Sequence, residues 1–177
     1  MRRLENDMTS ALLTAEMCAR AWDILLPAIA RAAETGVINK FDSTILVLDP
    51  TVQYREGGLI SDALLFANRV MVYEDADHDR SPTIYDTVAT EKAMLSWRTG
   101  LSSREVQQSA PHLYQRADVK WAGSVVRNGL VVSFSGVQAE FDEWISGMMA
   151  DLLDAMCRYA MNHKDGIMSD GHDAHVM

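Results

Sequence analysis

Residues 121–135 decide the fold, and they read WAGSVVR, then NG, then LVVSFS. The two flanking runs, Trp121 to Arg127 and Leu130 to Ser135, are rich in the β-branched and aromatic residues that strands favour. Asn128-Gly129 between them is the preferred sequence of a two-residue type I′ turn, because both central residues of that turn must accept a positive φ. The stretch therefore predicts a β-hairpin.

The strongest helical pattern in the chain follows this hairpin, directly after Gly136. Three acidic residues in its first turns complement the helix dipole: Glu140, Asp142 and Glu143. A broad apolar stripe recurs at helical spacing through Phe141, Trp144, Ile145, Met148, Met149, Leu152, Leu153 and Met156. A methionine-rich stripe also suits an adaptable binding face, but we interpret this one as core packing. The sequence therefore predicts a helix that covers the hairpin.

The segments before the hairpin predict further helices and strands. A helix begins at the N-cap Thr14 and ends near Gly36, and Pro27 is expected to kink or divide it. Next along the chain, we expect a buried strand at residues 44–48, a loop and then a helix within 51–69, and a strand at 70–73. A helix is expected at 83–99, where Gly100 closes it. A short helix capped by Ser102 or Ser103 then runs through Ala110 and ends at Pro111. The order predicts an α+β protein with an antiparallel sheet flanked by helices.

Composition and charge limit the partners. The chain has 177 residues and a formal net charge of −9, and it lacks both a basic cluster and a basic amphipathic helix. An acidic surface repels nucleic acid and anionic lipid, so we expect neither as a partner. Cys18 and Cys157 fall in helical patterns and are interpreted as free thiols, with a disulfide between them as the alternative.

Length and hydropathy predict a single domain at residues 1–162 and a flexible tail at 163–177. No apolar run of about 18 residues is present to span a bilayer. The first residues also lack the apolar segment of a secretory signal. A cytoplasmic location is therefore expected.

Two stretches resemble the GlcG/HbpS family, which includes the C-terminal domain of PduO-type proteins. The first runs from Thr90 through Lys92 to Arg98 and is similar to the family's Lys-Ala helix and the arginine segment after it. The second runs from Gly123 to Asp142 and is similar to its strand, Asn/Asp-Gly turn, strand, Ser-Gly and acidic helix start. The resemblance implies a profilin- or PAS-like α/β/α sandwich, a compact homo-oligomer, and binding of haem, another tetrapyrrole or a small metabolite.

The chain departs from this pattern in three respects. The doubled glycine before the hairpin is reduced to Gly123. Residues 49–69 form a longer insertion where the family has a glycine-rich stretch. No histidine precedes His78, so the first helix and first strand offer no haem ligand.

Four residues are candidates for a ligand or catalytic site. Lys92 lies close to Met94 and Leu95, so burial would lower its pKa and make it a base or an anion anchor. The alternative is a structural lysine that snorkels or forms a salt bridge, and we favour it. Arg98 is the second candidate. The amides of Ser135 and Gly136 lie before a helix and suit a carboxylate or phosphate, unless Ser135 simply caps that helix.

Metal sites are weaker alternatives. His163, His172 and His175 would collect a divalent metal if the C-terminal tail folded back. Asp75, Asp77 and Asp79 alternate as in a calcium loop, but the central glycine and final glutamate of an EF-hand are absent, so a solvated loop is favoured. The sequence contains no nucleophile elbow, P-loop, dinucleotide fingerprint or HExxH motif.

Three functions follow from this set. The first is a small-ligand-binding or accessory protein of GlcG/HbpS type. The second is a small catabolic lyase, isomerase or hydrolase that uses Lys92 or Arg98. The third is a structural partner subunit that meets another chain through its methionine-rich helix.

Overall fold

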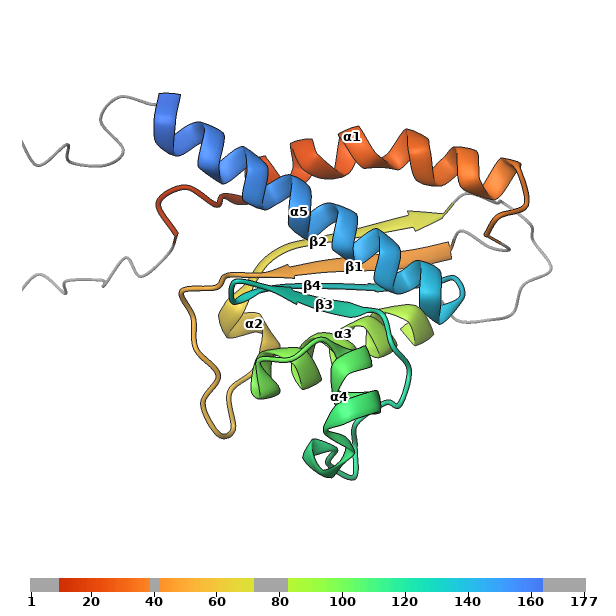
Figure 1. Ribbon diagram of the computed structural model, residues 1–177, viewed down its shortest axis with the longest axis vertical. Coiled ribbons are helices and arrows are strands. Elements are labelled where there is room, and N and C mark those ends of the chain that lie inside the picture. Colours follow the sequence, from red (N-terminus) through yellow and green to blue (C-terminus); the bar gives the residue numbers. More distant parts are fainter. Residues whose placement is uncertain (1–9, 39–41, 72–82, 164–177) are drawn as a thin grey trace, which may run out of the picture.

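The computed structural model describes residues 10–38, 42–71 and 83–163. Figure 1 shows its helices and strands. The helices are α1 (Ala15–Glu34), α2 (Ile60–Ala63), α3 (Thr83–Thr99), α4 (Ser103–Ser109), the short 3-10 helix η1 (Pro111–Leu113) and α5 (Ala139–His163). The strands are β1 (Asp42–Leu48), β2 (Leu64–Met71), β3 (Ser124–Arg127) and β4 (Leu130–Ser135).

The strands form a four-stranded antiparallel sheet in the order β2-β1-β4-β3. The predicted hairpin is confirmed, because β3 and β4 pair from Arg127 opposite Leu130 onward. Its turn has the positive φ values that the Asn-Gly sequence predicts, 51° at Asn128 and 86° at Gly129. The hairpin is shorter than expected on its first side, since β3 begins at Ser124 and leaves Trp121 outside the sheet.

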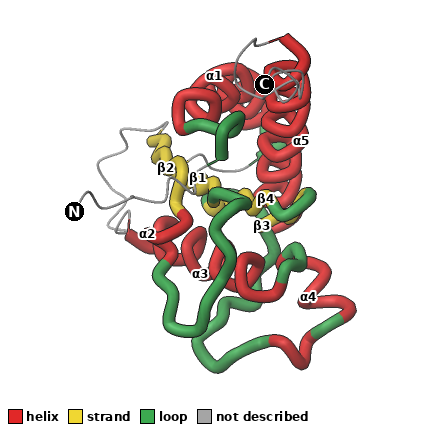
Figure 2. The backbone as a smooth tube through the Cα atoms, turned by 90° about the vertical axis from the view of Figure 1, so that its left-hand side faces the viewer, coloured by secondary structure: helices red, strands yellow, loops and turns green. Residues whose placement is uncertain are grey.

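Helices cover both faces of this sheet. Figure 2 shows α1 and α5 on one side of the strands, and α2, α3 and α4 on the other. The predicted α+β architecture, an antiparallel sheet flanked by helices, is confirmed. Among the described residues, no helix combines the length and apolar character needed to cross a bilayer.

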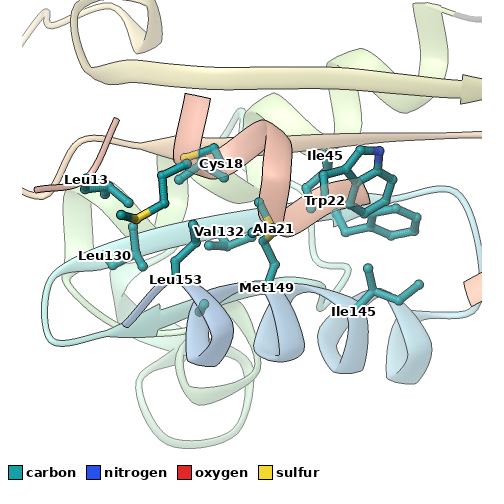
Figure 3. Close-up of a cluster of buried hydrophobic side chains, with 14 of the residues drawn as sticks. Leu13, Cys18, Ala21, Trp22, Ile45, Leu130, Val132, Ile145, Met149 and Leu153 are labelled. Atoms are coloured by element: carbon teal, nitrogen blue, oxygen red, sulfur yellow. The ribbon is translucent and has the colours of Figure 1, made fainter. Parts of the chain in front are cut away.

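The larger hydrophobic core lies between the sheet and the α1–α5 layer (Figure 3). Alternate residues of β1 and β4 point into it, because successive side chains of a strand face opposite sides. The apolar stripe predicted for residues 141–156 supplies the facing surface, so its interpretation as core packing is confirmed for every member except Trp144, which is 41% exposed. The residues of this core that Figure 3 labels are Leu13, Cys18, Ala21, Trp22, Ile45, Leu130, Val132, Ile145, Met149 and Leu153. Both cysteines are free thiols, as expected.

Helix α1 begins and ends where the sequence predicts. The hydroxyl oxygen of Thr14 accepts a hydrogen bond from the Met17 amide at 3.1 Å. Gly36 follows the C-cap Thr35, and its amide donates to the Ala33 carbonyl at 3.0 Å. Pro27 was expected to kink or divide the helix, but α1 is one continuous element of 20 residues across it.

We expect Thr14→Ala to lower the free energy of unfolding by about 1 kcal/mol, because the variant loses the acceptor for an otherwise unpaired helix amide. Urea denaturation followed by circular dichroism measures this loss. Thr35→Ala at the exposed opposite end of α1 is the control, and its stability should change by less than half as much. Equal losses in the two variants would contradict the capping role of Thr14.

The predicted boundaries of the loop, the helix and the strand within residues 51–73 are wrong. Only Ile60–Ala63 is helical, and β2 begins at Leu64, about six residues before the expected strand. Residues 64–71 pair with β1 along its whole length, with one irregularity between Val47 and Leu48. The apolar run that suggested a helix is a strand because this long-range pairing outweighs local periodicity. Residues 72 and 73 of the expected strand lie outside the described residues.

Candidate functional site

Lys92 on α3 lies in the interior of the protein, with 1% of its surface exposed. Its ammonium is 2.6 Å from Oδ2 of Asp142 on α5. It also donates to the Phe134 carbonyl at 3.2 Å. Two partners therefore hold the ammonium in a fixed position.

This ion pair joins helices that lie on opposite faces of the sheet (Figure 1). The two side chains meet beside Gly123, immediately before β3 begins. A Cβ at Gly123 would lie 2.6 Å from Nζ of Lys92 and 2.8 Å from Cβ of Asp142. The contact between the two helix layers therefore depends on the absence of a side chain at this position.

The other carboxylate oxygen of Asp142 binds the backbone that leads into its own helix. It accepts a hydrogen bond from the Val137 amide at 3.0 Å, and the Gly136 amide also donates to this carboxylate. Ser135 is buried in β4, and α5 begins only at Ala139. The alternative in which Ser135 caps the helix is therefore wrong, because Asp142 binds the amides at the entry to α5.

Burial and the attraction between the two charges shift the pKa values of this pair in opposite directions. Burial is the larger influence on each group: it lowers the pKa of Lys92 and raises the pKa of Asp142. The attraction between the two charges and their hydrogen bond oppose both shifts. A buried ammonium held by a carboxylate of the opposite helix layer and by a carbonyl of the sheet is suited to anchoring two helices, which agrees with the favoured structural interpretation of Lys92.

A cluster of buried serines surrounds the same region, and the sequence analysis did not predict it. Ser96 and Ser124 share a hydrogen bond of 2.6 Å, and Ser124 also donates to the Lys92 carbonyl at 2.8 Å. Ser146 on α5 donates to the Gly123 carbonyl at 2.6 Å. Together these bonds tie α3 and α5 to Gly123 and Ser124, so they fix the path of the chain past the ion pair.

Arg98 belongs to a different group of contacts. Its guanidinium binds the Asp118 carboxylate at 2.5 Å and the Leu113 carbonyl at 3.0 Å. The same carboxylate accepts from the Gln115 amide at 2.6 Å. The structure thus brings Lys92 together with the segment at Ser135 and Gly136, whereas Arg98 holds the loop after η1.

Two cavities lie on the α3 side of the sheet. The larger has a volume of about 480 Å³ and is formed by the loop before α2 and by α3. Its lining residues are Val52, Gln53, Arg55, Glu56, Gly57, Gly58, Asp62 and Trp97. The smaller, of about 280 Å³, lies between β1, β2 and α3 and is lined by Thr44, Leu46, Ala67, Asn68, Arg69, Asp86 and Thr90. Lys92 lines neither of them.

One wall of the larger cavity is a fixed aromatic ring. The Trp97 indole donates to the Val52 carbonyl at 2.8 Å. The Tyr54 ring meets it edge-on, with the centroids 5.3 Å apart. The residues 49–69 that distinguish this chain from the GlcG/HbpS pattern therefore supply most of a cavity whose remaining wall is α3.

Neither cavity suits haem. Their linings contain no histidine, cysteine, methionine or tyrosine to bind the iron axially. Within the described ranges, no group of three histidine, cysteine or acidic residues is arranged to hold a metal ion. His163 ends α5 and stacks on Tyr159 with centroids 4.1 Å apart. His172, His175 and the alternating aspartates at 75, 77 and 79 lie outside the described residues.

Comparison with known proteins adds a likeness of fold. No family model matches this chain, and no curated protein matches it. Klebsiella pneumoniae protein ORFY, described as DUF336, superposes with a TM-score of 0.52 and 16% identity over 88% of this chain and 97% of its own. A double mutant of Streptomyces reticuli HbpS gives a TM-score of 0.47 and 17% identity, with 86% and 94% covered. At these identities the likeness concerns the fold, and the match to ORFY carries it. This chain therefore has the GlcG/HbpS-like fold that its hairpin and final helix predicted.

Proposed function

We propose that this protein binds a small molecule in the cavity between residues 52–62 and Trp97, and that the ligand has a flat ring and a single carboxylate. The observation that carries the proposal is the pairing of a fixed aromatic wall with an arginine that has no ion-pair partner among the described residues. The volume of about 480 Å³ falls within the range of small-molecule sites.

The aromatic wall favours a planar ligand. Trp97 and Tyr54 already hold each other edge-on, and the hydrogen bond to Val52 prevents the indole from turning. A ring in the cavity can pack against this indole without the cost of ordering it first. A Cβ at Gly58 would lie 2.9 Å from the Arg55 carbonyl oxygen, so the absence of a side chain there allows the tight turn that places Arg55 beside this wall.

The charges select one kind of anion. The exposed Arg55 guanidinium offers paired N–H donors in the geometry that a carboxylate accepts. Glu56 and Asp62 line the same cavity and repel additional negative charge. A monocarboxylate satisfies Arg55 at a smaller electrostatic cost than a doubly charged phosphate.

Binding rather than turnover is proposed because the lining contains no serine, cysteine, lysine or histidine, and its two carboxylates, Glu56 and Asp62, have no such group beside them in the lining to form a catalytic pair. Lys92, the candidate base of the enzyme hypothesis, is buried in the ion pair and does not line the cavity. No observation in the described structure favours an enzyme over a binding protein.

Arg55→Ala should weaken binding of benzoate-type monocarboxylates by about tenfold or more, since hydrogen bonds to charged groups contribute roughly 1.5–3 kcal/mol. Arg116→Ala is the matched control, because it removes the same charge from another exposed position. Saturation-transfer NMR and titration calorimetry measure the affinities. Trp97→Leu should weaken the same ligands, and phenyl phosphate should bind less tightly than benzoate to the natural sequence.

Two results would overturn the proposal. In the first, aromatic monocarboxylates fail to bind the natural sequence at millimolar concentration. In the second, Arg55→Ala and Arg116→Ala bind them with equal affinity, which would place the ligand elsewhere on the surface.

A further inference from the structure

The cavity beside Trp97 carries more negative charge than a carboxylate ligand needs. It is lined by one guanidinium, that of Arg55, and by the carboxylates of Glu56 and Asp62. Within the described ranges, none of these three groups takes part in an ion pair. A monocarboxylate bound to Arg55 therefore leaves both lining carboxylates without a cation.

Asp62 is held in place by the backbone at the start of α2. Its Oδ2 accepts a hydrogen bond from the Leu59 amide at 3.0 Å. An ionised carboxylate has about four acceptor positions, so most of those on Asp62 remain available to a ligand. Its side chain is exposed on the cavity lining, and the bond to Leu59 orients it before any ligand arrives.

Glu56 lies in a tight turn next to Arg55. The Gly58 amide donates to the Arg55 carbonyl at 2.8 Å, which closes a turn with Glu56 at its second position. Glu56 is exposed, and it forms no ion pair with any described residue. The turn thus presents a guanidinium and a carboxylate to one cavity without pairing them with each other.

Two carboxylates alone do not make a divalent-metal site. Calcium takes about six to eight oxygen ligands, and the described residues hold no group of three histidine, cysteine or acidic side chains arranged for a metal. An ammonium group donates its hydrogen bonds to single oxygens and makes no such demand. The excess negative charge of this lining is therefore better matched by an amine than by a metal ion.

We propose that the ligand also carries a primary ammonium group, which Glu56 and Asp62 bind while Arg55 binds its carboxylate. This inference rests on the function proposed above and narrows its ligand class to aromatic compounds with both a carboxylate and an amine. Such a zwitterion places one charge opposite each kind of charge in the lining, so it avoids the repulsion that a monocarboxylate meets. The neighbouring Trp97 ring also attracts a cation through its face.

Matched ligands isolate the contribution of the ammonium. Para-(aminomethyl)benzoate and para-methylbenzoate share the ring and the carboxylate and differ in the amine, and the meta isomers form a second pair. We expect the aminomethyl member of at least one pair to bind the natural sequence about fivefold more tightly or better. Titration calorimetry at neutral pH and low ionic strength measures this ratio.

Neutral variants of the two carboxylates should act on the two kinds of ligand in opposite directions. Glu56→Gln and Asp62→Asn should each weaken the aminomethyl ligand by about threefold or more, and each should strengthen the methylbenzoates because a repulsion is removed. Asparagine still accepts the Leu59 amide, so the start of α2 is kept. Glu16→Gln and Asp23→Asn on the exposed side of α1 remove the same charges beyond the sheet and should change either affinity less than about twofold.

The outcomes separate this inference from the function on which it rests. Aminomethyl ligands that bind no more tightly than the methylbenzoates would overturn the inference alone, provided that Arg55→Ala weakens both. Failure of all four ligands to bind at millimolar concentration would overturn the inference and the proposed function together. If Glu56→Gln and Asp62→Asn both behave as their α1 controls do, the ammonium does not lie in this cavity and the inference is wrong.

Discussion

Lys92→Met should lower the free energy of unfolding at neutral pH by about 3–5 kcal/mol, because it leaves the Asp142 carboxylate buried without its partner. Methionine keeps the length of the side chain, so the loss reports the charge rather than a cavity. Urea denaturation followed by tryptophan fluorescence measures it. The double variant Lys92→Met/Asp142→Asn should recover most of the loss, since the asparagine is neutral and still accepts a hydrogen bond from the Val137 amide.

The same variant should depend on pH in a defined direction. Burial raises the pKa of Asp142, and without the ammonium nothing of comparable size opposes that increase. A group with a raised folded pKa binds more protons folded than unfolded. Stability of Lys92→Met relative to the natural chain should therefore be greatest below the ordinary carboxyl pKa of 3.8 and should fall as pH rises through the higher folded value. A loss that is independent of pH would indicate that Asp142 stays charged in the variant, and wild-type stability would show that the pair does not anchor the helices.

Gly136→Ala should lower the free energy of unfolding by about 3 kcal/mol or more, because strained backbone and overpacking add together. A Cβ at this position would lie 2.6 Å from the Cα of Ser43 on the neighbouring strand and even closer to the Asp42 carbonyl. The φ of 152° is also one that residues with a side chain rarely adopt. Thermal and urea denaturation measure the effect.

Gly129→Ala is the control that separates these two causes. Gly129 has a φ of 86°, but the nearest atom to a Cβ there is the Pro50 Cβ at 3.9 Å. The free energy of unfolding of Gly129→Ala should therefore fall only by the cost of the strained backbone, about 1–2 kcal/mol. If both glycine variants lose the same stability, the close approach of Gly136 to β1 contributes nothing.

Elements with strong local signals were predictable from the sequence. The hairpin follows from Asn128-Gly129, α1 from its cap at Thr14, and α5 from its apolar stripe, because turn chemistry, capping and periodicity act within a few residues. The prediction for β2 was wrong because Leu64–Met71 forms a strand through its pairing with β1. The residues near it in the sequence do not indicate that pairing.

The candidate site shows the same limit. The apolar neighbours of Lys92 made it a candidate, but its partner Asp142 lies 50 residues away in the sequence. The sequence analysis interpreted Asp142 as an acidic residue that complements the dipole of its own helix. One signal was available: Asp142 occupies the same helical stripe as Ile145 and Met149, so its carboxylate had to be buried and to need a cation. The cavity beside Trp97 was beyond sequence reasoning, because it depends on how the loop before α2 folds against α3.

On the outer side of β3, the Val126 amide donates to the Ser102 hydroxyl, and the Ser124 amide donates to the Ser103 hydroxyl. A sheet open at both sides can add strands without end and lead to a fibre, whereas a sheet with one closed side has only one place to join. The amides of Ser124 and Val126 are therefore not available to a strand of another chain. Ser102 and Ser103 thus cover this edge against pairing with another sheet, and Ser102 is also the N-cap of α4.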